Sequence, residues 1–318
     1  MQIMDKKVSS EKIGKLVENI EKVFVGRRET VELALTALFS GGHLLIVDLP
    51  GVGKTTLAKA IGLSIRGRTK RLQFTPDLLP SDVTGVSIYI HSKGEFEFHP
   101  GPVFANILLA DEINRATPRA QSSLLEAMEE CQVSADGKTY RLEQPFLVIA
   151  TQNPIEVQGT YPLPEAQLDR FLISVTIGYP DRKRENLIME SRAASDPIGA
   201  IEPVMGLGEV EEIKAECRKV FVDPVVKGYI LDIVEATRRR PEILIGASPR
   251  ASLSLLHAAQ TRAMFQSRDF VTPEDVKRMA APVLAHRIIL RTATRLNLDN
   301  NTAVVNGILA EIPVPKKV

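Results

Sequence analysis

The chain has 318 residues, with 40 Lys and Arg against 39 Asp and Glu, so its formal net charge at pH 7 is +1. At roughly 150 residues per domain this length predicts about two domains, and the 44% hydrophobic and 25% charged content excludes disordered chains and fibrous repeats. Near-neutral charge also argues against a dedicated nucleic-acid-binding protein, which normally carries a basic domain.

The first two thirds of the chain alternate apolar runs of strand length with helical patterns. Amphipathic helices are predicted over residues 9–22 and 29–39, the second ended by Gly41 and Gly42. The predicted buried strands are residues 43–48, 70–74, 106–110, 147–151 and 172–177, and the predicted helices between them are 54–65, 118–130 and 164–170. This alternation predicts a parallel sheet with helices on both faces.

Two segments, near residues 86–99 and 131–142, interrupt the alternation. Each has the pattern of two short strands around a turn, which predicts a hairpin. In the second, Asp136 and Gly137 suit the two positive φ angles of a type I′ turn. Both segments are therefore treated as hairpin inserts in the core.

The last third differs in composition. Residues 191–208 are rich in small residues, Pro and Gly, as is typical of a linker. Beyond them the pattern predicts helices only, and three begin with a capping residue followed by Pro: Asp223-Pro224, Ser248-Pro249 and Thr272-Pro273. We expect an α/β core over residues 1–190, a linker over residues 191–208 and a small all-α domain over residues 209–318.

The N-terminal stretch, the apolar runs and the cysteines indicate where the protein is located. The N-terminal stretch is polar and lacks the apolar core of a signal peptide, and the apolar runs are shorter than the roughly 18 residues of a membrane span. Cys131 and Cys217 form no CxxC pair, and the five histidines lack metal-ligand spacing. We expect a cytoplasmic protein with no membrane span, disulfide framework or zinc site.

A candidate phosphate-binding loop lies between the first predicted strand and the following helix. It consists of Pro50, Gly51, Val52, Gly53, Lys54, Thr55 and Thr56. Glycines let backbone N–H groups turn inward around phosphate oxygens, and the helix N-terminus adds the positive end of its dipole. Lys54 would reach the β and γ phosphates, and the Thr55 hydroxyl would coordinate Mg²⁺. The full P-loop pattern has Gly where this chain has Asp48, whose carboxylate would repel phosphate unless it points away.

Two later strands deliver polar groups to the edge of the predicted sheet. One ends in Asp111 and Glu112, at the edge where α/β proteins bind ligands. Asp111 would hold Mg²⁺, often through water, and Glu112 would polarise an attacking water as general base. The next strand ends in Asn153, whose neutral amide would orient the water or contact the γ-phosphate.

With these motifs, nearly the whole chain resembles the AAA+ ATPases, and specifically the MoxR family. The resemblance also rests on residues 104–116 (FANILLADEINRA) and on residues 159–171 (GTYPLPEAQLDRF), the more family-specific stretch. It implies a P-loop NTPase (AAA+) fold, with a parallel-sheet core that has helices on both faces and a small all-α lid domain. Asp48 looks like a variation that the family tolerates.

The resemblance also implies roles and partners. It implies a homo-oligomeric ring, usually a hexamer, with ATP and Mg²⁺ between subunits. By motif match, Arg170 is an arginine finger for the neighbouring subunit's γ-phosphate, Arg250 is the sensor-2 arginine that reaches from the lid to the nucleotide, and Val25 and Gly26 contact adenine. Arg250 lies in the first turn of a predicted helix, where a cation opposes the helix dipole by about 0.3–1 kcal/mol, so its placement suggests a functional reason. The two hairpins match inserts that face the ring axis or partners in relatives.

The leading hypothesis is an Mg²⁺-dependent ATPase that acts as a chaperone for assembly, maturation or metal insertion. Because relatives of this kind work with partners that contain a von Willebrand A domain, the resemblance implies such a partner, on a separate chain. Nucleic acid is not expected to be a partner.

Two alternatives stay open. The first is a magnesium-chelatase-type or helicase-like motor subunit, which salt-sensitive, DNA-stimulated ATPase activity would favour. The basic residues that could line the pore of such a helicase are Lys138 and Arg141 of the second hairpin. A further stripe at helical spacing, Arg287, Arg291 and Arg295, is interpreted as a solvated helix face. The second is a nucleotide-gated assembly scaffold with slow hydrolysis. Large ATP-dependent changes in oligomer mass with almost no turnover would favour that scaffold.

Overall fold

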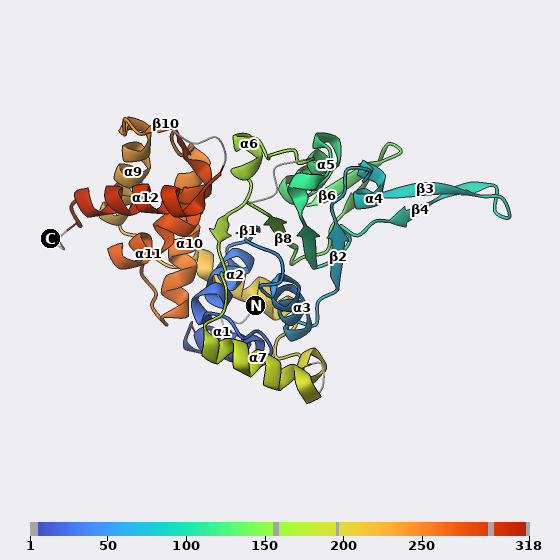
Figure 1. Ribbon diagram of the computed structural model, residues 1–318, viewed down its shortest axis with the longest axis horizontal. Helices are drawn as coiled ribbons and strands as arrows, with labels where there is room; N and C mark the ends of the chain where they lie inside the picture. The colour runs from blue at the N-terminus through green and yellow to red at the C-terminus, as the bar shows by residue number, and fades with distance from the viewer. Residues whose placement is uncertain (1–5, 155–158, 195–196, 292–295, 316–318) are drawn as a thin grey trace.

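A five-stranded parallel sheet forms the centre of the computed structural model, which describes residues 6–154, 159–194, 197–291 and 296–315 (Figure 1). The strand order is β2-β5-β8-β1-β9. The strands are β1 (Leu44–Val47), β2 (Thr69–Gln73), β5 (Ile107–Asp111), β8 (Leu147–Gln152) and β9 (Ile173–Val175). Every boundary lies within two residues of the prediction, and the predicted parallel α/β sheet is confirmed. The expectation that residues 70–74 are a buried strand was wrong, because β2 lies at the edge of the sheet and its residues are exposed or half-buried.

Helices cover both faces of this sheet (Figure 1). Successive side chains of a strand point to opposite faces. Leu44 and Ile46 of β1 accordingly belong to one apolar cluster, and Leu45 and Val47 to the other. The first cluster includes side chains of α1 (Lys6–Glu21), α2 (Arg28–Phe39) and α3 (Lys54–Ser64), and the second includes those of α5 (Pro118–Glu130). Burial on both faces explains why β1 reads as a continuous apolar run rather than an alternating one.

Both predicted hairpins form outside the sheet. The first, made of β3 (Gly85–Ile90) and β4 (Glu95–Pro100), follows α4 (Pro80–Thr84) and projects far from the core as an arm (Figure 1). The second pairs β6 (Gln132–Ala135) with β7 (Lys138–Arg141). Asp136 and Gly137 have φ values of 50° and 74°, as a type I′ turn requires. Phe98 of the first hairpin stacks on Tyr140 of the second with ring centroids 4.1 Å apart, so the two inserts contact each other.

The C-terminal part is a helical lid. Its helices are α8 (Leu207–Arg218), α9 (Pro224–Arg239), α10 (Pro249–Phe265), α11 (Pro273–Leu284) and α12 (Leu298–Glu311). The expectation of helices alone was wrong in one detail, because β10 (Ile243–Ile245) and β11 (Ile289–Leu290) pair as a short antiparallel ladder. Strands of two and three residues are too short to show a twofold sequence pattern.

The remaining elements lie within the core, between the core and the lid, or within the lid. They are α6 (Glu165–Leu168), α7 (Arg182–Ala194) and the 3₁₀ turns Ile113–Arg115, Pro197–Ala200 and Ala285–Arg287. Helix α7 continues through Ala194, so the start of the segment expected as a linker is helical. Among the described helices, each is too short or too polar to cross a bilayer.

The predicted arginine stripe is not a helix face. Helix α11 ends at Leu284, and Arg287 closes a 3₁₀ turn just before β11. Arg287 is only 6% exposed and pairs with Asp169, so its interpretation as a solvated arginine was wrong. Arg291 is exposed and donates to a backbone carbonyl, and Arg295 lies outside the described residues.

Two buried histidines are held in their neutral form. His43 Nδ1 accepts the backbone N–H of Val148 at 3.0 Å, and its Nε2 therefore carries the proton that faces the Met128 carbonyl at 3.1 Å. His286 Nε2 lies 2.9 Å from the Phe171 carbonyl oxygen. Burial lowers the pKa of His43 to about 4 and the pKa of His286 to about 3.

Acidification from pH 6.5 toward pH 4 is therefore expected to reduce stability. In this window the unfolded chain protonates both histidines and the folded chain does not, so their contribution is complete above pH 6.5 and falls by up to about 1.4 kcal/mol per pH unit for each. Urea unfolding at pH 7 and pH 5 measures this loss. His43→Gln should show a smaller pH dependence than the wild type, and His91→Gln, at an exposed turn, should match the wild type. Equal slopes in all three proteins would contradict the assignment.

Candidate active site

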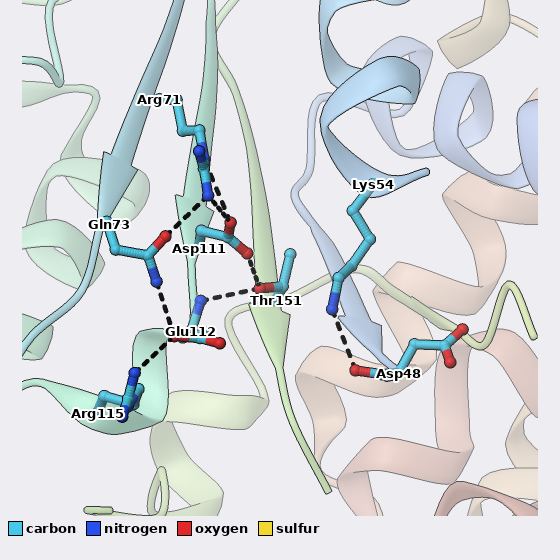
Figure 2. Close-up of polar contacts among 8 residues, drawn as sticks. All are labelled: Asp48, Lys54, Arg71, Gln73, Asp111, Glu112, Arg115 and Thr151. Carbon is cyan, nitrogen blue, oxygen red and sulfur yellow. Dashed lines mark hydrogen bonds and ion pairs between the residues drawn. The ribbon is translucent and has the colours of Figure 1, made fainter. Parts of the chain in front are cut away.

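The loop between β1 and α3 has the geometry that its sequence predicts. Gly51 and Gly53 have φ values of 84° and 94°, in the left-handed region that glycine adopts without strain. Lys54 is the first residue of α3, and its Nζ donates to the backbone oxygen of Asp48 at 3.0 Å (Figure 2). The loop thus leads into a helix N-terminus, where backbone N–H groups are available to an anion.

The Asp48 carboxylate points away from Lys54 (Figure 2). Its Oδ1 accepts the N–H of Leu49 at 2.7 Å, and its Oδ2 accepts the N–H groups of Ile177 and Gly178, both at 2.7 Å. Asp48 is 5% exposed, so these are buried, charge-assisted bonds. The departure from the P-loop pattern thus has a structural purpose, because the carboxylate ties the loop to the segment that follows β9.

Replacing Asp48 by Ala is expected to destabilise the fold by about 3 kcal/mol, because up to three backbone N–H groups lose a charged acceptor. Chemical denaturation gives the free energy of unfolding directly. The matched control is Asp232→Ala on the exposed side of α9, which should change stability by less than about 0.5 kcal/mol. Equal effects of the two substitutions would show that the Asp48 contacts contribute nothing.

Asp111 and Glu112 meet Thr151 at the carboxyl edge of the sheet (Figure 2). Thr151 Oγ1 donates to Asp111 Oδ1 at 2.6 Å and accepts the backbone N–H of Glu112 at 2.8 Å. Glu112 has φ 55° and ψ 49°, a left-handed conformation that is uncommon outside glycine and concentrates at functional sites. Asn153 follows β8 at the same edge and is half-buried. Sequence reasoning overlooked Thr151, although its place at the end of a buried strand was a usable signal.

Side chains from β2 complete the acidic cluster, and the sequence did not identify them. Arg71 Nη2 donates to Asp111 Oδ2 at 2.7 Å, and Gln73 Nε2 donates to Glu112 Oε2 at 2.7 Å. Arg115 Nη1 approaches the same Glu112 oxygen at 3.1 Å. In the β2–β5 register Gln73 lies directly opposite Asp111, which follows from strand pairing rather than from any local motif. Glu112 is therefore held by two donors from different parts of the chain.

Lys54 faces this acidic cluster across the site (Figure 2). Burial lowers the pKa of Lys54, and the charges of Asp111, Asp48 and Glu112 act in the opposite direction. A buried cation opposite two carboxylates is an arrangement that a phosphate and a divalent cation can bridge, because each added charge meets its opposite.

The donor set suits Mg²⁺ held together with a phosphate. Within the described part of the chain no three His, Cys, Asp or Glu residues gather as a metal cage. Mg²⁺ needs no such cage, since it keeps several waters and uses one or two protein oxygens beside phosphate. Thr55 lies in the first turn of α3, and both Asp111 oxygens already accept hydrogen bonds, which favours contact of Asp111 with the ion through water.

An open pocket adjoins the loop. Its lining includes residues 51–53 and Thr56 together with Val25, Gly26 and Tyr179. The structure therefore brings the residues expected to contact adenine beside the loop, and Pro50 is exposed nearby at the loop tip. A mixture of apolar side chains and backbone polar groups is typical of pockets that bind small molecules. Tyr179 also lines this pocket, and the sequence did not identify it, because its place there depends on the course of the chain after β9.

Arg170 and Arg250 form a second cluster. Arg170 follows α6, Arg250 is the second residue of α10, and both pair with Glu129 near the end of α5. The Nη2–Oε distances are 3.1 Å for Arg170 and 2.6 Å for Arg250. Among the residues that the structure describes, neither arginine lines the pocket beside the loop. The sequence assigned these arginines separate roles, and the fold places them together.

Comparison with known proteins identifies two family regions. Residues 43–173 match the model described as "ATPase family associated with various cellular activities (AAA)", and residues 235–307 match the AAA lid domain. The two regions coincide with most of the sheet core and of the lid.

Full-length relatives extend this similarity. The chain is 48% identical to the protein YeaC of Bacillus subtilis over 95% of each chain. It is 39% identical to the chaperone MoxR1 of Mycobacterium tuberculosis over 93% of this chain and 81% of the relative. It is also 30% identical to the protein MoxR of Methylorubrum extorquens over 93% of each. A solved structure from Cytophaga hutchinsonii, assigned as an ATPase, matches 98% of this chain and 97% of its own with a TM-score of 0.88 and 37% identity.

Proposed function

Since the chain belongs to the MoxR family of AAA+ ATPases, we propose that it binds and hydrolyses MgATP where Lys54, Asp111 and Glu112 converge. The observation that carries this proposal is the geometry of that convergence. Three strand ends and one helix N-terminus bring a buried ammonium, two carboxylates and a glycine loop to one edge of the sheet.

Each residue has a specific task in the proposed reaction. Lys54 and the N–H groups of the loop bind the phosphates. The Thr55 hydroxyl and Asp111 would hold Mg²⁺, which would supply positive charge to offset that of the phosphates. Glu112 accepts a proton from the attacking water as general base, and Asn153 orients that water. Gln73 and Arg115 hold the Glu112 carboxylate in place before the nucleotide binds.

The assembled form we propose is a homo-oligomeric ring, hexameric as is usual for this family. Arg170 is then presented to the nucleotide of the neighbouring subunit. Arginine is suited to this task because its planar guanidinium matches phosphate oxygens.

The proposed role is that of a cytoplasmic chaperone that assembles or matures other proteins, including metal insertion into them. The similarity to the chaperone MoxR1 over 93% of this chain supports it. The proposed partner class is a separate protein with a von Willebrand A domain. The exposed hairpin arm, with Phe96 71% exposed, offers apolar surface outside the ATP site.

Three measurements on the wild-type chain test the proposal. Calorimetric titration with MgATP should show saturable binding, and a phosphate-release assay should show turnover that needs both ATP and Mg²⁺. Native mass spectrometry with and without ATP tests the ring. A titration without heat would reject the nucleotide site itself, whereas binding without turnover would favour the alternative of a nucleotide-gated scaffold.

A further inference from the structure

Glu129 joins Arg170, the proposed arginine finger, to Arg250, which the family resemblance gives as the sensor-2 arginine. Its Oε2 pairs with Arg170 of the core and its Oε1 with Arg250 of the lid. Glu129 lies in the last turn of α5, and Arg250 lies in the first turn of α10. The helix dipole disfavours a negative charge at the first position and a positive charge at the second. Their mutual contact compensates both placements and gives Arg250 a partner that the sequence alone did not reveal.

The segment that carries Arg170 is also attached to the lid from behind. The Ser248 hydroxyl donates to Asp169 Oδ2 at 2.8 Å, and Arg287 Nε pairs with Asp169 Oδ1 at 3.2 Å. Arg287 Nη2 further donates to the backbone oxygens of Asp169 and Phe171. Asp169 and Phe171 flank Arg170 in the sequence, so the lid grips the chain on both sides of this arginine.

Arg287 keeps its charge in this position. It is 6% exposed, and burial lowers its pKa to about 10, well above neutral pH. A buried guanidinium that stays ionised needs its Asp169 partner, so the junction between the lid and the Arg170 segment is a specific contact rather than an adaptable surface.

From these contacts we propose that Glu129 is a positioning residue that holds Arg170 and Arg250 as one two-guanidinium unit aimed at a single phosphate. The inference rests on the proposed ATPase function. Two cations this close repel each other, and the carboxylate between them offsets that repulsion and sets their spacing. The lid residues Ser248 and Arg287 bind the segment that carries Arg170, so Arg170 and Arg250 move together when the lid moves.

The geometry indicates positioning rather than blockage of the arginines. Each guanidinium contacts Glu129 through one terminal nitrogen, and a guanidinium has five N–H donors. The side chains of Arg170 and Arg250 are 29% and 43% exposed, so donors remain accessible to a phosphate. A carboxylate that blocked the arginines would compete for the same donors, and its removal would raise activity.

The test compares Glu129→Gln with Glu130→Gln in the full-length protein. Both remove one charge from adjacent, exposed residues of α5, but only Glu129 contacts the arginines. Glu129→Gln is expected to lower kcat by about 10- to 100-fold, the effect of a misplacement near 1 Å, with the Kd for MgATP and the melting temperature unchanged. Glu129→Asp should recover part of kcat, and Glu130→Gln should match the wild type. An unchanged or raised kcat in Glu129→Gln would overturn the proposal.

A double-mutant cycle separates positioning from a merely structural role. Because Glu129 is proposed to act through both arginines, the cycle uses the variant in which Arg170 and Arg250 are both replaced by Ala. Adding Glu129→Gln to that variant should lower turnover no further. Additive losses would mean that Glu129 acts elsewhere and would overturn the proposal. If the wild type itself does not hydrolyse ATP, the proposed function has failed; if the wild type is active and only the Glu129 variants disagree, this inference alone has failed.

Discussion

Replacing Glu112 by Gln is expected to lower ATP turnover by about 10²- to 10⁴-fold, the contribution typical of a general base. The amide has the same shape as the carboxylate but cannot take up the proton of the attacking water. Glu112 is already held by Gln73 and Arg115, so the substituted side chain should keep its place. Lys54 and the glycine loop are untouched, so MgATP should still bind. Phosphate release gives kcat, and calorimetry gives the Kd.

The matched control is Glu126→Gln, the same substitution on the exposed surface of α5, which should leave both constants unchanged. Normal turnover in Glu112→Gln would remove Glu112 from its role, and Asp111 would then be the remaining carboxylate of the cluster. Loss of binding together with turnover would instead mean that the hydrogen bonds around Glu112 shape the phosphate site.

Arg170→Ala is expected to cause the largest loss, a fall in kcat of about 10³- to 10⁵-fold, as arginine fingers do in phosphoryl transfer. The residue lies outside the pocket beside the loop, so nucleotide binding by the same subunit should change little. Arg119→Ala, which removes an exposed arginine from the first turn of α5, serves as the control for the loss of one positive charge. Steady-state turnover and calorimetry measure the two effects separately.

Mixing two inactive variants tests whether Arg170 acts on a neighbour. A Lys54→Ala subunit keeps Arg170 but loses its own phosphate site, and an Arg170→Ala subunit keeps the site but lacks the finger. Their mixture should regain activity, because some interfaces combine an intact site with an intact arginine. A mixture as inactive as its components would contradict action between subunits.

The strands and the phosphate loop were predictable from the sequence because local rules govern them. A strand buried on both faces must be apolar along its whole length, so residues 44–47 and 147–150 are recognisable without a partner. Two positions of the loop have a left-handed backbone conformation that favours glycine, so the glycines of the motif predict that conformation. The short β10–β11 ladder escaped prediction because two or three residues show no period.

The arrangement around the candidate site was only partly predictable. The order of strands in the sheet brings Gln73 opposite Asp111 and Thr151 beside Glu112, although about 40 residues separate each pair. Sequence patterns predict local secondary structure from residues that are close in the chain, whereas the order of strands depends on the packing of the whole chain. Arg287 shows the same difference, since its spacing suggested a solvated face and its burial came from contact with Asp169.

The amino-acid sequence by itself determined that this chain is a parallel α/β core followed by a helical lid, with Lys54, Asp111 and Glu112 as its candidate chemistry. Those features follow from hydrophobic periodicity, capping residues and glycine positions, which act over a few residues. Only the tertiary structure decided that Asp48 faces away from the phosphate loop and that Glu129 unites Arg170 with Arg250. The direction of the Asp48 side chain depends on the core segment that follows β9, and the meeting of Glu129 with Arg250 depends on how the lid packs on the core. No local pattern encodes either kind of packing.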